Sequence, residues 1–101
     1  MASLETLAEL ARTIEARKAS TADASYTKSL LESGTNRCAK KFGEEAVEFA
    51  LAVANQSDDD VTSEAADVLY HLLVALAARG LLGMTRLVET LFKLAKNVVQ
   101  R

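Results

Sequence analysis

Hydrophobic and polar residues follow the period of an α-helix along most of this chain. In the first segment the apolar positions are three or four residues apart, as one face of a helix requires. These positions are Leu4, Leu7, Leu10, Ala11 and Ile14. Ser3 directly precedes them and is a residue type that caps helix N-termini. We therefore predict a first helix that Ser3 caps.

The remaining pattern predicts one short and three longer helices with short connections. Residues 18–25 are small and polar and indicate a loop. A short helix is predicted for Tyr26–Ser33 and stops at Gly34. A long helix follows, from Thr35 or Asn36 to about Asn55, and a second long helix, capped by Ser57 or Asp58, runs to Arg79 and is ended by Gly80. The last predicted helix covers roughly Arg86 to Val99. Short connections between long helices favour antiparallel neighbours. We predict a single domain, residues 1–101, folded as an all-α antiparallel bundle with two long central helices.

Each of the two long central helices, which end at about Asn55 and at Arg79, carries a narrow acidic stripe on an otherwise apolar surface. On a helical wheel, Glu44, Glu45 and Glu48 fall within about 100° of one another. The next long helix places Glu64 and Asp67 in one stripe. A surface helix normally has a broad polar face, so narrow stripes on two consecutive helices indicate a site.

If the two helices pack antiparallel, the pairs Glu45/Glu48 and Glu64/Asp67 supply four carboxylates to one pocket. Four anions in a partly dry site repel one another unless a cation is bound. Carboxylate oxygens suit magnesium or manganese, and two ions could position a water and polarise a phosphoryl oxygen. The alternative is a solvated acidic face with ion pairs such as Lys41–Glu45.

Basic residues occupy the opening turns of the first long helix. Arg37, Lys40 and Lys41 oppose the helix dipole there, and a bound phosphate would turn that cost into a gain. The alternative is that water solvates them. His71 shares the stripe of Asp67, so it is either a hydrogen-bond partner of that carboxylate or a core residue.

Composition narrows the class of protein. The 101 residues suffice for one domain, and half of them are apolar, which suggests that some surface is buried against another subunit. A net charge of -2 argues against a nucleic-acid binder. The only cysteine, Cys38, can form no internal disulfide. The N-terminus is not typical of a signal peptide, and the apolar run Val68–Ala78 is short for a membrane span. We therefore expect a cytoplasmic protein.

Two stretches resemble a known family. Lys41–Glu48 reads KFGEEAVE, and Glu64–Val74 reads EAADVLYHLLV. Both are similar to phosphoribosyl-ATP pyrophosphatases, which belong to the MazG-type all-α pyrophosphohydrolases. Upstream, the similar positions are Ile14–Lys18, Ser25–Thr27, Leu30, Gly34 and Lys40–Lys41. The resemblance covers about residues 4 to 80, and the segment after Gly80 is more apolar and more basic than the family pattern.

The resemblance implies magnesium-dependent hydrolysis of phosphoribosyl-ATP to phosphoribosyl-AMP and pyrophosphate, the second step of histidine biosynthesis. It implies that Glu45, Glu48, Glu64 and Asp67 hold magnesium, for which manganese is a possible substitute, and that Glu44 is an additional acid. The candidate phosphate contacts are Arg37, Lys40 and Lys41, and the candidates for the ribose-phosphate end are Arg17, Lys18, Tyr26 and Lys28. Family members pair as dimers, so we expect a homodimer or higher homo-oligomer with the active site near the interface.

Two other functions fit the same residues. One is a housecleaning pyrophosphatase of the same superfamily, which acts on damaged or surplus nucleotides. The other is a non-catalytic helical dimer that serves as an adaptor, which predicts neither magnesium affinity nor pyrophosphate release. Hydrolysis assays on phosphoribosyl-ATP and on ordinary nucleoside triphosphates distinguish the three.

Overall fold

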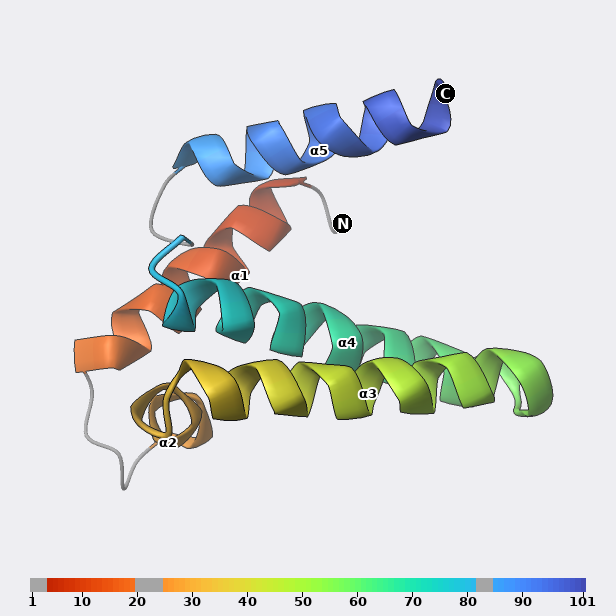
Figure 1. Cartoon of the computed structure of the whole chain (residues 1–101), viewed down its shortest axis with the longest axis horizontal. Helices are drawn as coiled ribbons and strands as arrows, with labels where there is room; N and C mark the ends of the chain where they lie inside the picture. The colour runs from red at the N-terminus through yellow and green to blue at the C-terminus, as the bar shows by residue number, and fades with distance from the viewer. Residues whose placement is uncertain (1–3, 20–24, 82–84) are drawn as a thin grey trace.

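The computed structural model describes residues 4–19, 25–81 and 85–101, which form helices joined by short connections (Figure 1). This described part of the chain contains no β-strand, which confirms the predicted all-α class. The elements in chain order are α1 (Leu4–Ala16), the 3-10 turn η1 (Arg17–Ala19), α2 (Tyr26–Glu32), α3 (Thr35–Asn55), α4 (Asp58–Ala78) and α5 (Thr85–Val99).

The helix boundaries agree with the predicted ones to within a few residues. α3 ends at Asn55 as expected, and α4 ends one residue early, with Arg79 as its C-cap. The predicted loop was wrong at residues 18 and 19, because the chain tightens after α1 into the 3-10 turn η1. The predicted cap Ser3, loop residues 20–24 and turn residues 82–84 lie outside the described residues.

The two long helices α3 and α4 lie side by side and antiparallel (Figure 1). Each has 21 residues, and only Gln56 and Ser57 connect them. At the opposite end, Thr35 Oγ1 donates a hydrogen bond to the carbonyl of Ala78 over 3.4 Å. The start of α3 therefore lies beside the end of α4, and the middle of α3 lies beside the second turn of α4.

The N-terminus of α4 is capped in the way that its sequence predicts. Ser57 is extended, and its side chain accepts a hydrogen bond from the backbone N–H of Asp60 at 3.2 Å. Three aspartates, Asp58, Asp59 and Asp60, occupy the first turn, where the helix dipole favours negative charge.

Replacing Ser57 by Ala is expected to destabilise the fold by about 1 kcal/mol, because the N–H of Asp60 loses its acceptor. For a domain of this size, that loss lowers the melting temperature by roughly 4–8 °C. Thermal unfolding followed by circular dichroism measures the effect. The matched control is Ser63→Ala, since Ser63 is exposed in the helix interior and alanine is well tolerated there. An equal loss in both variants would contradict the capping role.

A small core joins α1, α2, α3 and α4 at one end of the long helix pair. The fully or nearly buried apolar residues of this core are Ala11, Ile14, Leu30, Cys38, Leu73, Val74 and Ala77. Gly34, at the junction of α2 and α3, has φ +96°, a conformation that residues with a side chain rarely adopt. This junction turns the chain so that α2 lies across the start of α3 (Figure 1).

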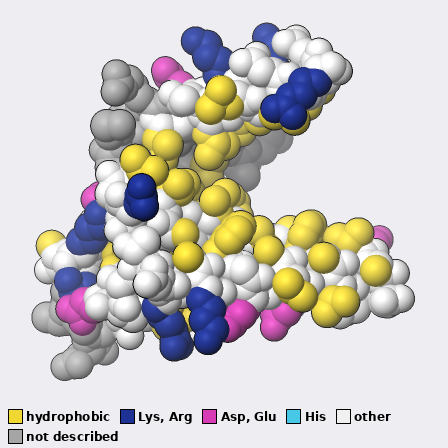
Figure 2. All heavy atoms as spheres, in the orientation of Figure 1, with side chains coloured by type: hydrophobic (Ala, Val, Ile, Leu, Met, Phe, Trp, Pro, Cys, Tyr) yellow, Lys and Arg dark blue, Asp and Glu magenta, His cyan; other side chains and the backbone are white. Residues whose placement is uncertain are grey.

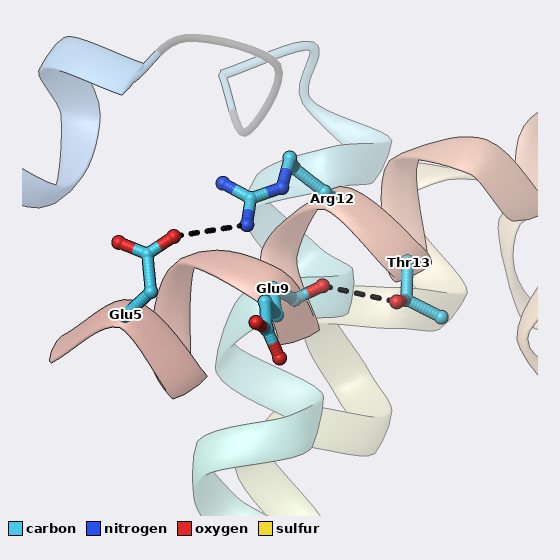
Figure 3. A network of polar contacts seen from close by, with 4 residues as sticks. All are labelled: Glu5, Glu9, Arg12 and Thr13. Carbon is cyan, nitrogen blue, oxygen red and sulfur yellow. Dashed lines mark hydrogen bonds and ion pairs between the residues drawn. The ribbon is translucent and has the colours of Figure 1, made fainter. Parts of the chain in front are cut away.

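The outer face of α1 is polar. Arg12 forms an ion pair with Glu5 at 3.2 Å, and the hydroxyl of Thr13 donates to the carbonyl of Glu9 at 2.9 Å (Figure 3). Such exposed contacts contribute little to stability. They show instead which face of α1 points to solvent, since Ala11 and Ile14 point into the core.

Helix α5 forms a separate arm above the α3–α4 pair, and a wide notch lined by hydrophobic side chains separates the two (Figure 2). An apolar hollow at the base of this notch is lined by Leu7, Leu69, Leu72, Leu73, Leu76, Leu87, Leu91 and Phe92. By length and composition alone, α4 could cross a membrane, a test that core helices of soluble proteins also pass. In the structure α4 packs along α3 and contributes four buried residues, His71, Leu73, Val74 and Ala77.

Candidate functional site

Three carboxylates converge where α3 and α4 lie side by side. Glu45 and Glu48 are one turn apart on α3, and Glu64 faces them from the second turn of α4. One carboxylate oxygen from each residue lies within 4.8 Å of the others. We call these three residues the acidic cluster. Oxygen ligands of one Mg²⁺ with bonds of about 2.1 Å lie up to about 4.2 Å apart, so small side-chain rotations suffice to bind an ion.

Glu64 is the carboxylate whose environment is least favourable to its charge. Burial raises the pKa of Glu64 above its usual value, and the nearby charges of Glu48, Asp67, Glu45 and Asp60 raise it further. Its Oε2 atom is buried and has no hydrogen-bond partner among the described residues. A buried, unpartnered carboxylate oxygen that faces two other carboxylates is expected where a divalent cation binds. The donor set therefore fits such an ion.

The structure places Asp67 and Glu44 beside the acidic cluster, not within it. The Asp67 side chain is exposed one turn after Glu64, and its charge still acts on Glu64. Glu44 is exposed on α3 and lies 3.8 Å from the Nζ atom of Lys41. Three of the four predicted metal ligands thus come together, and a ligand role for Asp67 stays a prediction.

Of the predicted phosphate contacts, Lys41 is the one that touches the acidic cluster. Its Nζ atom lies 3.6 Å from Glu45, and its side chain is mostly buried. Arg37 and Lys40 are exposed on the opening turns of α3. All three cations therefore lie on the half of α3 that precedes the carboxylates. A phosphate chain bound at the acidic cluster could extend along this half of α3.

The predicted ribose-phosphate residues lie in two neighbouring hollows near α2. Arg17 and Tyr26 line a groove of about 270 Å³ together with Leu10, Thr13, Ile14, Ser25, Thr27 and Tyr70, and we call it the tyrosine groove. Lys18 and Lys28 line a hollow of about 320 Å³ near the end of α4. Lys28 donates a hydrogen bond to the carbonyl of Lys18 and pairs with Glu32 at 3.5 Å.

Sequence reasoning missed three residues of these hollows. Thr27 and Tyr70 hydrogen-bond to each other across 43 residues of sequence, and Arg79 lines the hollow that contains Lys18 and Lys28. The family resemblance includes Ser25–Thr27 and could have pointed to Thr27 as a site residue. Tyr70 lies in an apolar stretch of sequence, which predicts a packing residue. Burial raises the pKa of the Tyr70 hydroxyl, so this group remains neutral and available for hydrogen bonding.

His71 and Cys38 belong to the core. His71 is 6% exposed, its ring meets the ring of Tyr70 edge-on at 5.0 Å, and its Nδ1 atom has no hydrogen-bond partner among the described residues. The core interpretation of His71 is therefore the one the structure favours. Cys38 donates from Sγ to the carbonyl of Leu30 at 3.2 Å, and burial raises the pKa of its thiol, which keeps it protonated.

Comparison with known proteins gives one family. The family model described as phosphoribosyl-ATP pyrophosphohydrolase matches residues 7–94. A phosphoribosyl-ATP pyrophosphatase 1 from Rhodopseudomonas palustris is 53% identical over 75 residues, which are 74% of this chain and 70% of that protein. The phosphoribosyl-ATP pyrophosphatase of Azorhizobium caulinodans is 55% identical over 75 residues, again 74% of this chain and 69% of that protein.

A phosphoribosyl-ATP pyrophosphatase from Dinoroseobacter shibae is 54% identical over 76 residues, or 75% of this chain and 74% of that protein. The family model also extends further than the sequence had led us to expect. The resemblance noted in the sequence covers residues 4 to 80, whereas the match of the family model continues to residue 94 and includes most of α5. The acidic cluster and the tyrosine groove both lie within the matched segment.

Proposed function

This chain belongs to the phosphoribosyl-ATP pyrophosphohydrolase family, and we propose that it hydrolyses phosphoribosyl-ATP to phosphoribosyl-AMP and pyrophosphate in the second step of histidine biosynthesis. The observation that carries the proposal is the convergence of Glu45, Glu48 and Glu64 within 4.8 Å of one another. A purely structural bundle has no reason to bring three carboxylates together at a helix contact, because their repulsion destabilises the fold.

In this proposal Glu45, Glu48 and Glu64 bind Mg²⁺, and Asp67 joins them after a side-chain rotation. When bound, the ion supplies charge neutralisation and polarises a phosphoryl oxygen, chemistry that Mn²⁺ can also support. The family's typical use of a divalent metal agrees with this donor set. Binding the ion also removes the repulsion that the cluster otherwise imposes on Glu64.

The neighbouring residues would then position the phosphates and the water. Lys41 lies beside Glu45 and can bind a phosphate oxygen of the substrate, and Arg37 and Lys40 extend this positive charge along α3. Glu44 lies one residue before Glu45 and is exposed, so it can accept a proton from the attacking water. No side chain needs to form a covalent bond with phosphorus.

A housecleaning pyrophosphatase would use the same acidic cluster on ordinary nucleotides. What favours phosphoribosyl-ATP is the family match over residues 7–94 and the names of the relatives. A non-catalytic adaptor is disfavoured by the buried Oε2 atom of Glu64, which lacks any partner within the described chain.

Pyrophosphate release from phosphoribosyl-ATP is expected to require a divalent cation. Without added metal and with a chelator present, turnover should fall to background, and millimolar Mg²⁺ should restore it. A coupled pyrophosphate assay measures both conditions, with ATP as the competing substrate. Faster hydrolysis of ATP than of phosphoribosyl-ATP would favour the housecleaning function, and full activity with chelator would exclude the proposed metal role.

We also propose that the chain works as a cytoplasmic homodimer. The surface area of 7087 Å² exceeds by roughly 1,500 Å² the ~5,600 Å² expected for a compact monomer of this mass. The radius of gyration, 14.5 Å, is likewise larger than the ~12.7 Å expected for this length. The notch between α5 and the α3–α4 pair exposes the apolar residues responsible (Figure 2). A second copy of the chain would cover them.

A further inference from the structure

Tyr26 is an unusually exposed aromatic residue at the edge of the tyrosine groove. Tyr26 is 58% exposed, although it begins α2 only one turn before the core residue Leu30. Its ring stacks on that of Tyr70, with the centroids 6.5 Å apart and the planes inclined by 20°. The pair leaves a broad aromatic surface open to solvent, which is a feature typical of sites that bind flat ring systems.

Tyr70 gives this surface a rigid base. Its hydroxyl is hydrogen-bonded to Thr27, and its ring packs edge-on against the buried ring of His71. Ser25 caps α2 by accepting a hydrogen bond from the N–H of Lys28 at 3.1 Å, which fixes the backbone on either side of Tyr26. The groove is therefore held in shape by contacts between α2 and α4 before any ligand binds.

The tyrosine groove is close enough to the acidic cluster for one nucleotide to reach both. Tyr70 follows Glu64 by six residues on α4, which is about 9 Å along the helix axis and about 120° around it, so a ligand that reaches both must follow the surface of α4. Asp67 lies midway between them, one turn from each. A ribose and a triphosphate chain can span such a distance. A nucleotide whose phosphates lie at the acidic cluster can therefore place its base at Tyr26.

We propose that the tyrosine groove binds the adenine of phosphoribosyl-ATP by stacking on Tyr26 and distinguishes this substrate from ATP by the positive charge of the base. The inference rests on the proposed function. In phosphoribosyl-ATP the second ribose is attached to N1 of the adenine, and an N1-alkylated adenine is a planar cation at neutral pH. The faces of tyrosine rings attract cations, so this base stacks more tightly than the neutral adenine of ATP.

The rest of the groove suits the second ribose and its phosphate. Arg17 lines the groove, and a guanidinium is the side chain best shaped to bind a phosphate. Ser25 and Thr27 contribute hydroxyl groups to the lining of the groove, and Leu10 and Ile14 contribute apolar side chains. This combination of an aromatic platform, one cation and a few hydroxyls matches a phosphoribosyl group on a flat base.

The composition of the chain offers a direct test. Tyr26 and Tyr70 are its only two tyrosines, so a spectrum of protein labelled selectively at tyrosine rings reports on this groove alone. The probes are 1-methyladenosine, which carries the cationic base without any phosphate, and adenosine, which carries the neutral base. Neither probe needs a metal ion. We expect 1-methyladenosine to shift the Tyr26 ring signals and to bind about tenfold more tightly than adenosine.

Two variants give the matched comparison. Tyr26→Phe keeps the aromatic face and should bind 1-methyladenosine as the unchanged protein does, whereas Tyr26→Leu should lose about tenfold or more in affinity. The Tyr70 signals in Tyr26→Leu show whether the groove still folds. In hydrolysis assays, Tyr26→Leu should raise KM for phosphoribosyl-ATP about tenfold with little change in kcat, since the stacking acts on binding.

Unchanged Tyr26 signals at saturating 1-methyladenosine would overturn the inference, as would equal affinities for the two nucleosides. Preferential binding of 1-methyladenosine by a protein that does not hydrolyse phosphoribosyl-ATP would support the groove and refute only the proposed function. The binding and hydrolysis measurements are independent, so the two failures can be told apart.

Discussion

Replacing Glu64 by Gln is expected to lower kcat/KM for phosphoribosyl-ATP by about a thousandfold or more while the helical fold stays intact. The substitution keeps the size of the side chain and removes one of the three negative charges that would hold the cation. Steady-state kinetics at several Mg²⁺ concentrations measure the effect. If Glu64 acts only through the ion, very high Mg²⁺ should recover part of the activity.

The same substitution should stabilise the protein when no metal is present. Glu64 Oε2 is buried without a partner and faces Glu45 and Glu48, so neutralising it relieves both desolvation and repulsion. Thermal unfolding in the presence of a chelator should therefore show a higher melting temperature for Glu64→Gln. A variant that is more stable and less active is the pattern expected when a charged group is retained for function.

The raised pKa of Glu64 also predicts how the stability of the folded protein changes with pH. Because the pKa of Glu64 is raised in the folded protein, the folded state binds a proton more readily than the unfolded state. Glu64 therefore opposes folding at neutral pH, and its contribution becomes more favourable as the pH falls through the raised pKa toward the ordinary value of 4.5. Glu64→Gln should lack this gain in stability at mildly acid pH.

Three further variants make the test specific. Glu48→Gln and Asp67→Asn should each lower turnover by orders of magnitude if both side chains bind the ion, and Asp67→Asn in particular tests the ligand that lies outside the acidic cluster. Glu89→Gln, on the exposed surface of α5, is the matched control and should retain full activity. Full activity in Glu64→Gln or Glu48→Gln would refute the catalytic assignment.

The sequence predicted the acidic cluster because helical periodicity is a local property. Glu45 and Glu48 are one turn apart, Glu64 and Asp67 are one turn apart, and a two-residue connection between long helices leaves antiparallel pairing as the natural arrangement. The register of the two helices is a different kind of information. It decides that Glu64 meets Glu45 and Glu48 while Asp67 stays exposed, and it depends on the packing of core residues such as Cys38 and Val74.

The tyrosine groove could not be predicted from one sequence, because it too depends on how distant parts of the chain pack together. The hydrogen bond between Thr27 and Tyr70 joins residues 43 positions apart, and no periodicity relates α2 to α4. Tyr70 lies among apolar residues of α4, so its pattern is that of a core position. Its contact with Tyr26 appears only once Gly34 has turned α2 across the start of α3.

Helix α5 has an apolar stripe that includes the exposed residues Leu94 and Val98. Placing glutamates on this stripe is expected to break the proposed homodimer. Leu94 and Val98 lie one turn apart on that stripe and are 59% and 53% exposed in the single chain. In a monomer, substitutions at such exposed positions would change stability little. In a dimer that buries them, each side chain contributes about 1.5–3 kcal/mol, so the double variant Leu94→Glu/Val98→Glu should weaken association by roughly two to four orders of magnitude.

Size-exclusion chromatography with light scattering measures the outcome. The unchanged protein should have twice the 10.9 kDa mass of the chain at micromolar concentration, and the double variant should have the mass of one chain. Lys93→Glu, on the polar side of α5, introduces a glutamate next to the stripe and should leave the dimer intact. An unchanged protein of 10.9 kDa would refute the dimer. The excess apolar surface of α3, α4 and α5 would then need another occupant, because a chain of this size does not keep so much apolar surface in water without a partner.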